Sequence, residues 1–282
     1  MTTFSPGERA LRHVTAVSAG EPLDPRLRVT LNFHPTPPVL RGLADDGHYR
    51  SQFVTGTSNG GLTAHPGGDR WRWESRIFGG AYDHVPGEER PVYGALDFRR
   101  RSVGAAPRFG SAHLRLTGEV LARTTFCYPD SHFEPSAFGV ASRMALIELA
   151  EADARDLLDD YIEAQVHGPV RLDRDVEALV LDPSHRGTAV EAAARRLPCP
   201  IEWHPGFRVT IDRLRRHPDY RGPDYVDLAA EIAVDGRLDP RVLGEASGHD
   251  PQALKKVWHY LARFGRPVPS SSSTVHSTTD LV

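Results

Sequence analysis

The sequence predicts an α+β fold, with a glycine-rich β core that is mixed or antiparallel and helices at its N-terminal and C-terminal ends. Three observations indicate this class. Apolar and polar residues alternate over residues 27–33, as in a strand with one buried face. Seven glycines fall between residues 56 and 80, where short strands and bends fit better than long helices. Apolar residues recur at helical spacing near both ends of the chain.

The N-terminal region begins with a helix signal. The segment 5–8, Ser-Pro-Gly-Glu, has the residues of a capping box with proline at the first helical position, and Gly20 is expected to end the helix. A half-buried strand follows over 27–33. After it, the Pro-Pro pair at 37–38 begins a short helix that closes near Gly47.

The middle of the chain is expected to hold short strands. The candidates are Arg50–Thr55, Arg72–Phe78, Val92–Phe98, Ser111–Leu116, Tyr161–Val166 and Val176–Leu181. Residues 135–160 have a helical pattern instead. Ser184 or Thr188 is expected to cap a helix that runs to Leu197.

These elements are expected to form one α+β domain over residues 1–265. Within it, residues 207–265 are a mainly helical addition, and Asp250-Pro251 is a clear helix start. The segment 266–282 is polar and contains four consecutive serines, so we expect a disordered tail there.

Composition excludes several classes of protein. The 34 basic residues, of which only Lys255 and Lys256 are lysines, stand against 37 acidic residues, for a net charge of −3. Such a chain has no overall field for holding a nucleic-acid backbone, although arginines can still line a local pocket. No apolar stretch is long enough to span a bilayer, the N-terminus lacks the apolar core of a signal peptide, and two cysteines make no disulfide framework. We therefore expect a cytoplasmic protein that uses neither a membrane nor a broad nucleic-acid surface as a partner.

The strongest chemical signal lies in the strand candidate 161–166 and the residue that follows it. In a strand, Tyr161, Glu163, Gln165 and His167 share one face, about 7 Å apart at alternate positions. The opposite face is apolar and can pack on a core. A row of phenol, carboxylate, amide and imidazole indicates a chemical site, and a solvated strand face is the alternative on equal terms.

Three further segments have the residue types of a ligand site. Glycines and small hydroxyls over residues 55–61 let a ligand approach the backbone closely, although Asn-Gly also favours a plain hairpin turn. The polar residues of this loop are Thr55, Thr57, Ser58 and Asn59. His34 stands at the end of the first strand, and Arg28 lies on its polar face. Tyr82 follows a glycine bend, and its ring suits stacking on a flat ligand.

Fourteen histidines raise the alternative of a metal site. None is paired with a second histidine at i, i+4 spacing beside a carboxylate, as in His-Glu-x-x-His. No metal ligand is therefore assigned, and a site assembled from distant histidines stays open. The sequence also contains no phosphate-loop or dinucleotide fingerprint and no nucleophile elbow.

Several stretches of the chain resemble a bacterial family, common in actinobacteria, that is labelled only as a domain of unknown function. They are residues 29–35 (VTLNFHP), 49–53 (YRSQF) with 57–62 (TSNGGL), 78–82 (FGGAY), 108–111 (RFGS) and 161–168 (YIEAQVHG). The resemblance covers residues 5–265 and implies a family without implying an activity.

The order of these segments is also similar to that of ADP-ribosyltransferases. Such enzymes have an Arg or His on a first strand, a Ser/Thr-rich second strand and a glutamate on a late strand. The resemblance implies that the β core has this fold and that NAD is the substrate, so the partner is a small-molecule nucleotide. It also implies that His34 or Arg28 holds NAD together with the 55–59 loop, and that Glu163 positions the nicotinamide ribose.

The match departs from the family at one position. ADP-ribosyltransferases carry Glu-x-Glu or Gln-x-Glu with the catalytic glutamate last, whereas this chain has Glu163-Ala164-Gln165. Either Glu163 is catalytic, with Tyr161 two residues upstream, or Gln165 takes that position and the chain binds nucleotide without transferring anything.

The first expectation is therefore an NAD-consuming enzyme that cleaves the nicotinamide–ribose bond and transfers ADP-ribose to an unspecified acceptor. It predicts that Glu163, His34 and the loop at 55–60 line one cleft. The alternatives are a metal-dependent hydrolase of a nucleotide or other phosphorylated substrate, and a non-catalytic nucleotide-binding module. The setting of Glu163 separates catalysis from binding, because a carboxylate at the bottom of a cleft favours the first and one on an open face favours the second.

Overall fold

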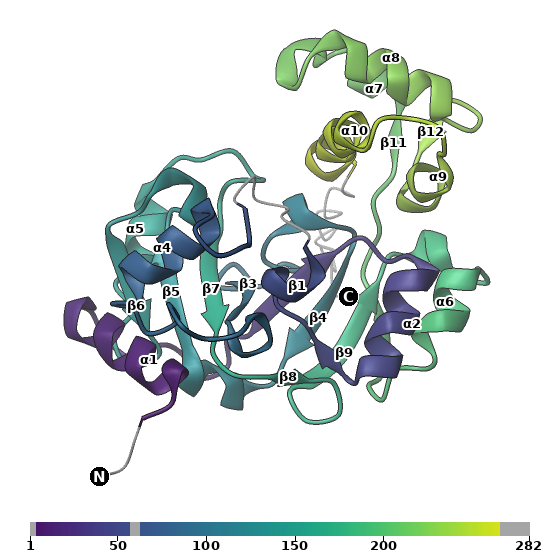
Figure 1. Ribbon diagram of the computed structural model, residues 1–282. Helices are drawn as coiled ribbons and strands as arrows, with labels where there is room; N and C mark the ends of the chain where they lie inside the picture. Colours follow the sequence, from purple (N-terminus) through teal and green to yellow (C-terminus); the bar gives the residue numbers. More distant parts are fainter. Residues whose placement is uncertain (1–3, 57–62, 266–282) are drawn as a thin grey trace, which may run out of the picture.

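The computed structural model describes residues 4–56 and 63–265 (Figure 1). Its centre is an eight-stranded sheet with the order β10-β9-β4-β1-β3-β7-β5-β6. The strands are β1 Val29–Phe33, β3 Val92–Leu96, β4 Ala112–Leu116, β5 Thr124–Tyr128, β6 Ala137–Val140, β7 Ile162–Val166, β9 Val176–Leu181 and β10 Ile201–Trp203. Neighbouring strands are antiparallel except β9 and β10, which are parallel. The α+β class with a mostly antiparallel sheet is therefore confirmed.

Helices and two small sheets surround this centre. The α-helices are α1 Pro6–Val17, α2 Pro37–Asp46, α3 Gln52–Thr55, α4 Asp69–Ile77, α5 Leu146–Ala152, α6 Ala189–Ala194, α7 Ile211–Leu214, α8 Pro223–Ile232, α9 Pro240–Glu245 and α10 Pro251–Phe264. The 3-10 turns are η1 Gly87–Glu89, η2 Pro107–Phe109, η3 Gly118–Arg123, η4 Ser131–Phe133, η5 Pro183–His185 and η6 Pro218–Tyr220. The small sheets pair β2 His48–Tyr49 with β8 Val170–Arg171, and β11 Val209–Thr210 with β12 Arg237–Leu238. Over the described ranges, no helix has the length and apolar character needed to cross a membrane.

One face of the central sheet carries the main hydrophobic core. Alternate strand residues, such as Leu31, Leu114 and Ile162, belong to this core and are at most 1% exposed. Leu40 of α2 and Ala194 of α6 belong to the same cluster and are fully buried. The period of two along the strands therefore places the apolar side chains under these helices.

The opposite face is also covered. Helices α1 and α4 pack over its β5–β6 end, at the left in Figure 1. Beside them a loop over residues 103–110 crosses β1 and β3, where Thr30 Oγ1 accepts a hydrogen bond from the Ala105 amide and Asn32 Nδ2 donates to the Val103 carbonyl, both at 2.9 Å. Because both faces are covered, β1 is buried at all its positions. The expectation of a half-buried first strand is wrong.

The C-terminal helices α7 to α10 gather at the upper right of Figure 1 around a cluster of their own, with Leu214 and Leu261 fully buried. Trp258 of α10 joins this cluster to the central sheet. Its indole N–H donates to the carbonyls of Pro107 and Arg108, both at 3.0 Å, and so holds η2 in place.

Helix ends follow the cap signals closely. Ser5 and Glu8 form the predicted capping box, with Ser5 Oγ 3.3 Å from the Glu8 amide. Helix α1 nevertheless ends at Val17, before Gly20. Helix α2 ends at Gly47, which has a φ of 67°. Thr188 caps α6, and Asp250 caps α10.

Two expected strands are helices, and one expected helical region contains a strand. Residues 52–55 form α3, and the region expected as a strand over 72–78 lies mostly in α4. Alternating Trp and Arg over 71–73 imitates a strand, but the buried positions of α4 are 70, 73, 74 and 77, which is helical spacing. Within 135–160, β6 precedes α5.

Candidate active site

The polar face of β7 is buried. Tyr161, Glu163, Gln165 and His167 are 1%, 7%, 1% and 3% exposed, so the alternative of a solvated strand face is wrong. β7 lies between β3 and β5, and its apolar residues belong to the main core as expected. Burial obliges each polar group of this row to find a partner.

The C-terminal half of the row is a closed hydrogen-bond chain. Thr125 Oγ1 donates to Gln165 Oε1 at 2.9 Å and lies 3.0 Å from His167 Nε2. The hydroxyl proton of Thr125 is donated to Gln165, so His167 Nε2 donates to Thr125 Oγ1. His167 Nδ1 is then the unprotonated nitrogen, and it accepts from the Tyr82 hydroxyl at 2.8 Å. Burial lowers the pKa of His167 to about 3, which agrees with this neutral tautomer.

The N-terminal half of the row surrounds Glu163. Gln165 Nε2 donates to Glu163 Oε1 at 3.0 Å, and Ser131 donates to Glu163 Oε2 through its hydroxyl at 2.8 Å and its amide at 3.3 Å. The Tyr161 hydroxyl donates to the Asp130 carboxylate. These contacts fix the carboxylate of Glu163 in one orientation.

A small cavity of about 70 Å³ lies beside Glu163. Its walls come from β1, β3 and β7, from α4, from η4 between β5 and β6, and from the loop that carries η2. We call it the Glu163 cavity. The lining residues used below are Gln52, Arg70, Tyr93, Phe109, Asp130, Ser131, Tyr161 and Glu163.

Arg70 is the buried cation of this cavity, with 2% of its surface exposed. Its guanidinium carbon lies 4.0 Å from the centre of the Tyr93 ring, and its Nη1 donates to Ser131 Oγ at 3.4 Å. The Ser131 hydroxyl therefore links Arg70 to Glu163. Arg70 Nε and Gln52 Oε1 are buried and have no hydrogen-bond partner within the described residues. A ligand that offers one acceptor and one donor would satisfy both.

The protonation of Glu163 depends on its burial and on the charges of Arg70 and Asp130. Burial raises the pKa of its carboxyl above the ordinary value, although the neighbouring Arg70 guanidinium opposes the shift and the charge of Asp130 adds to it. A carboxylate that accepts three hydrogen bonds from Gln165 and Ser131, beside an arginine and in a cavity wall, has the surroundings of a reactive group rather than those of a surface residue.

Only part of the predicted residue set meets in this cavity. Glu163 and Tyr161 line it, whereas Gln165 lies behind Glu163 and supports it through the hydrogen bond described above. Tyr82 is fully buried against His167, their rings 5.9 Å apart and nearly parallel. Ring stacking on a ligand is therefore replaced by stacking on His167.

The other predicted residues lie elsewhere. Arg28 pairs with Glu177 at 2.6 Å and does not line the cavity. Thr55 ends α3 and is exposed, and it also stands outside the lining. Thr57, Ser58 and Asn59 lie outside the described residues. His34 lines a neighbouring, larger cavity that shares Phe109 with the Glu163 cavity.

Arg70, Asp130 and Ser131 are site residues that the sequence analysis missed. Arg70 is in a segment whose helical spacing was hidden by Trp-Arg alternation. Asp130 and Ser131 follow β5, and Asp130 caps η4 by accepting from the His132 amide. An Asp-Ser pair directly after an aromatic and β-branched run is a signal that indicates such a strand-end site.

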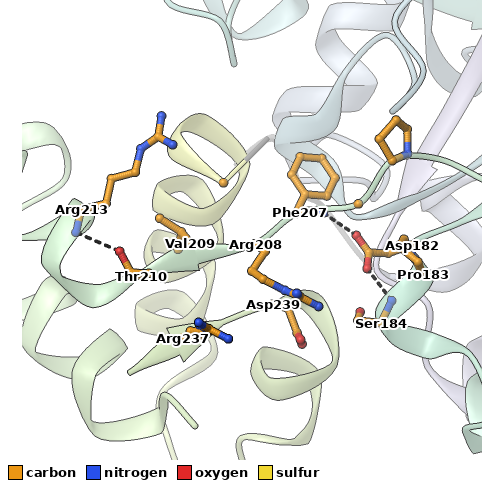
Figure 2. A pocket seen from close by; sticks show the side chains of 13 residues that line it. Asp182, Pro183, Ser184, Phe207, Arg208, Val209, Thr210, Arg213, Arg237 and Asp239 are labelled. Atoms are coloured by element: carbon orange, nitrogen blue, oxygen red, sulfur yellow. Dashed lines mark hydrogen bonds between the residues drawn. The ribbon is translucent and has the colours of Figure 1, made fainter. Parts of the chain in front are cut away.

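A cavity of about 680 Å³ lies between η5 and the C-terminal helices, and none of the predicted residues lines it (Figure 2). Asp182 in its wall is already used, because it accepts from the amides of Ser184 and Phe207, each at 2.8 Å. The arginines Arg208 and Arg213 are exposed and point in different directions in Figure 2.

Over residues 4–56 and 63–265, no three His, Cys, Asp or Glu side chains are placed to hold a metal ion. The metal-dependent hydrolase alternative therefore has no ligand set in the described part of the chain.

Comparison with known families decides the membership of the chain. A family model described as "Protein of unknown function (DUF3626)" matches residues 28–152 and residues 140–264. The chain belongs to this family. The resemblance to a family of unknown function is thus confirmed, and the residues that line both the Glu163 cavity and the neighbouring cavity lie inside the matched ranges of this DUF3626 member. No curated protein matches the sequence at a significant level.

Proposed function

We propose that the Glu163 cavity is the active site of an enzyme that cleaves the nicotinamide–ribose bond of NAD and transfers ADP-ribose to an acceptor. The observation that carries this proposal is the setting of Glu163, a carboxylate that is 7% exposed and lines a small cavity beside Arg70. A carboxylate in that position favours catalysis over recognition at an open surface.

Cleavage of the nicotinamide–ribose bond requires one negative charge placed beside the ribose. Breaking the bond between nicotinamide and ribose builds oxocarbenium character on the sugar, as glycoside hydrolysis does, and a fixed carboxylate stabilises the charge that develops. Nicotinamide leaves as a neutral molecule, so no protein acid is needed. Ser131 and Gln165 hold Glu163 in place before the substrate arrives, which lowers the cost of reorganisation.

The unpartnered groups of the cavity suit the leaving group. A carboxamide supplies an acceptor for Arg70 Nε and a donor for Gln52 Oε1, the two atoms of the lining that have no hydrogen-bond partner within the described residues. Tyr93 and Phe109 add aromatic walls for a flat ring. A volume of about 70 Å³ fits only one end of a dinucleotide, so the nicotinamide end enters and the remainder lies beyond the mouth.

The test is release of nicotinamide from NAD by the purified protein. Wild type is expected to release it, and Glu163→Gln, which keeps the shape of the side chain and removes its charge, is expected to lose the activity. Glu177→Gln is the matched control, because Glu177 is a half-buried carboxylate of the same sheet that pairs with Arg28 and does not line the cavity. Equal rates for both variants would remove Glu163 from the proposal.

A further inference from the structure

The cavity that His34 lines has a different character from the Glu163 cavity. It measures about 460 Å³ and lies where the end of β1 and the η2 segment meet α9 and α10. We call it the junction cavity. Its basic lining residues are His34, Arg108, His185 and Lys255, and its floor includes Trp258 and Leu243.

The lining of the junction cavity contains four basic side chains. None of the described residues that line the junction cavity is Asp or Glu, although the whole chain carries three more acidic than basic residues. Arg108 does form an ion pair with Asp159, which lies outside the lining. A planar guanidinium has five donors, so this pair leaves Arg108 further donors for a ligand.

His185 supplies an independent sign of a missing partner. Its side chain is 3% exposed, and neither ring nitrogen has a hydrogen-bond partner within the described residues. Buried polar groups are normally paired, and a buried unpaired imidazole that lines a cavity points to an absent ligand.

The pKa shifts of the lining residues are also consistent with a site for an anion. Burial lowers the pKa of the Lys255 ammonium below its ordinary value, and the positive charges of Arg108 and Lys256 add to the shift. Burial also lowers the pKa of His185, although the negative charges of Asp182, Asp239 and Glu245 oppose the shift. An anion in the cavity would reverse these shifts, because a nearby negative charge favours the protonated forms.

We propose that the junction cavity binds the phosphate group of a small organic molecule, with Arg108, Lys255 and the two histidines on the phosphate and the apolar floor under the organic part. Two basic side chains and two imidazoles suit a doubly charged group better than a single carboxylate. The volume lies in the range of small-molecule sites, which are mostly apolar with a few convergent polar groups. This inference goes beyond the proposed function and holds for any phosphorylated ligand.

The two lysines of the chain make a direct test possible. Reductive methylation with ¹³C-formaldehyde keeps their charge and labels Lys255, Lys256 and the N-terminal amine, so few NMR signals need to be assigned. Pyrophosphate is the probe. The Lys255 signal is expected to move in a saturable way and its pKa to rise, while the Lys256 signal, one residue outside the lining, does not follow. No saturable movement of Lys255 at millimolar pyrophosphate, or equal movement of both lysines, would overturn the proposal.

Substitutions then measure the contact. Lys255→Gln is expected to weaken pyrophosphate binding about tenfold, the loss typical of one charge-assisted hydrogen bond. Lys256→Gln is the matched control and is expected to bind as wild type does. Unchanged affinity in Lys255→Gln contradicts the assignment, and the wild-type titration stands even if that variant folds poorly.

Inhibition of NAD cleavage by pyrophosphate shows whether the phosphate bound in the junction cavity belongs to NAD or to a separate molecule. If the site holds the diphosphate of NAD, pyrophosphate competes with NAD in nicotinamide release. If a separate phosphorylated molecule binds there, pyrophosphate leaves the KM for NAD unchanged. Absence of NAD cleavage contradicts the proposed function alone, because pyrophosphate binding is measured without turnover.

Discussion

The Glu163 cavity and the junction cavity share the wall residue Phe109 but differ in how their polar groups are satisfied. In the Glu163 cavity the carboxylate is held by Ser131 and Gln165 and faces a buried arginine. In the junction cavity His185 has no hydrogen-bond partner within the described residues, and the lining is cationic.

This difference separates two tasks. A charge held in advance by its own protein costs little to reorganise, which suits a group that acts on a transition state. Basic side chains beside an imidazole that has no hydrogen-bond partner within the described residues are stabilised when an anion arrives, which suits a group that binds. In the two proposals, the bond cleavage therefore belongs to the first cavity and ligand recognition to the second.

The largest change in stability is expected at Gly110, next to Phe109 in the wall that both cavities share. Gly110 follows η2 with a φ of 153°, and a Cβ there would lie 1.9 Å from the carbonyl carbon of Phe33. Gly110→Ala is expected to cost more than about 3 kcal/mol of unfolding free energy, since backbone must move at the end of β1. Urea denaturation measures this loss of stability.

The control is Gly42→Ala inside α2, where a Cβ has open space around it. This variant is expected to stabilise the protein by about 0.5–1 kcal/mol. Similar stability for the two variants would show that η2 is not pressed against β1.

Two buried histidines test the contrast in hydrogen bonding directly. His167→Leu leaves the Tyr82 hydroxyl without an acceptor and Thr125 without a donor, and is expected to cost about 2–4 kcal/mol. His185→Leu removes an imidazole that has no hydrogen-bond partner in the described part of the chain, and is expected to change stability by less than about 1 kcal/mol or to increase it. Equal losses of unfolding free energy in the two variants would contradict the difference in hydrogen bonding between His167 and His185.

The pH dependence of stability sharpens the same contrast. Burial lowers the pKa of His167 from 6.5 to about 3, so the unfolded chain binds more protons than the folded one between these values. The stability that neutral His167 contributes is present above pH 6.5 and is lost as pH falls towards 3. Removing this histidine is expected to reduce the fall in unfolding free energy by up to about 1.4 kcal/mol per pH unit in that window. Identical slopes for wild type and His167→Leu would contradict the neutral tautomer.

The smallest effect is expected at Arg28, which lies in neither cavity. Its ion pair with Glu177 is partly exposed, with about 28% of the Arg28 side chain accessible, so Arg28→Gln is expected to cost about 1 kcal/mol or less. The KM for NAD is expected to stay at the wild-type value. A clear rise in KM with unchanged stability would return Arg28 to the NAD site.

The sequence carried enough information for Glu163 but not for its surroundings. Alternation along 161–167 places its side chain on the face of β7 opposite the main core, because the period of a strand is local. Arg70 and Ser131 come from α4 and from the turn after β5, and only the sheet order brings β5 beside β7. No local pattern encodes that neighbourhood.

The same limit applies to the fold and to the junction cavity. Caps at Ser5 and Asp250 were readable because the signal is a few residues long. The strand expected over 72–78 failed because alternating Trp and Arg resemble a strand when the tertiary contacts are unknown. The basic residues of the junction cavity come from four distant segments and meet only because Trp258 docks α10 on η2.

Steady-state cleavage of NAD by wild type and Glu163→Gln tests the central claim most directly, with folding of both proteins matched by denaturation. The account predicts that wild type releases nicotinamide and that the variant loses at least about a hundredfold in kcat with little change in KM, because the carboxylate acts on the transition state. An unchanged kcat in the variant would contradict the account.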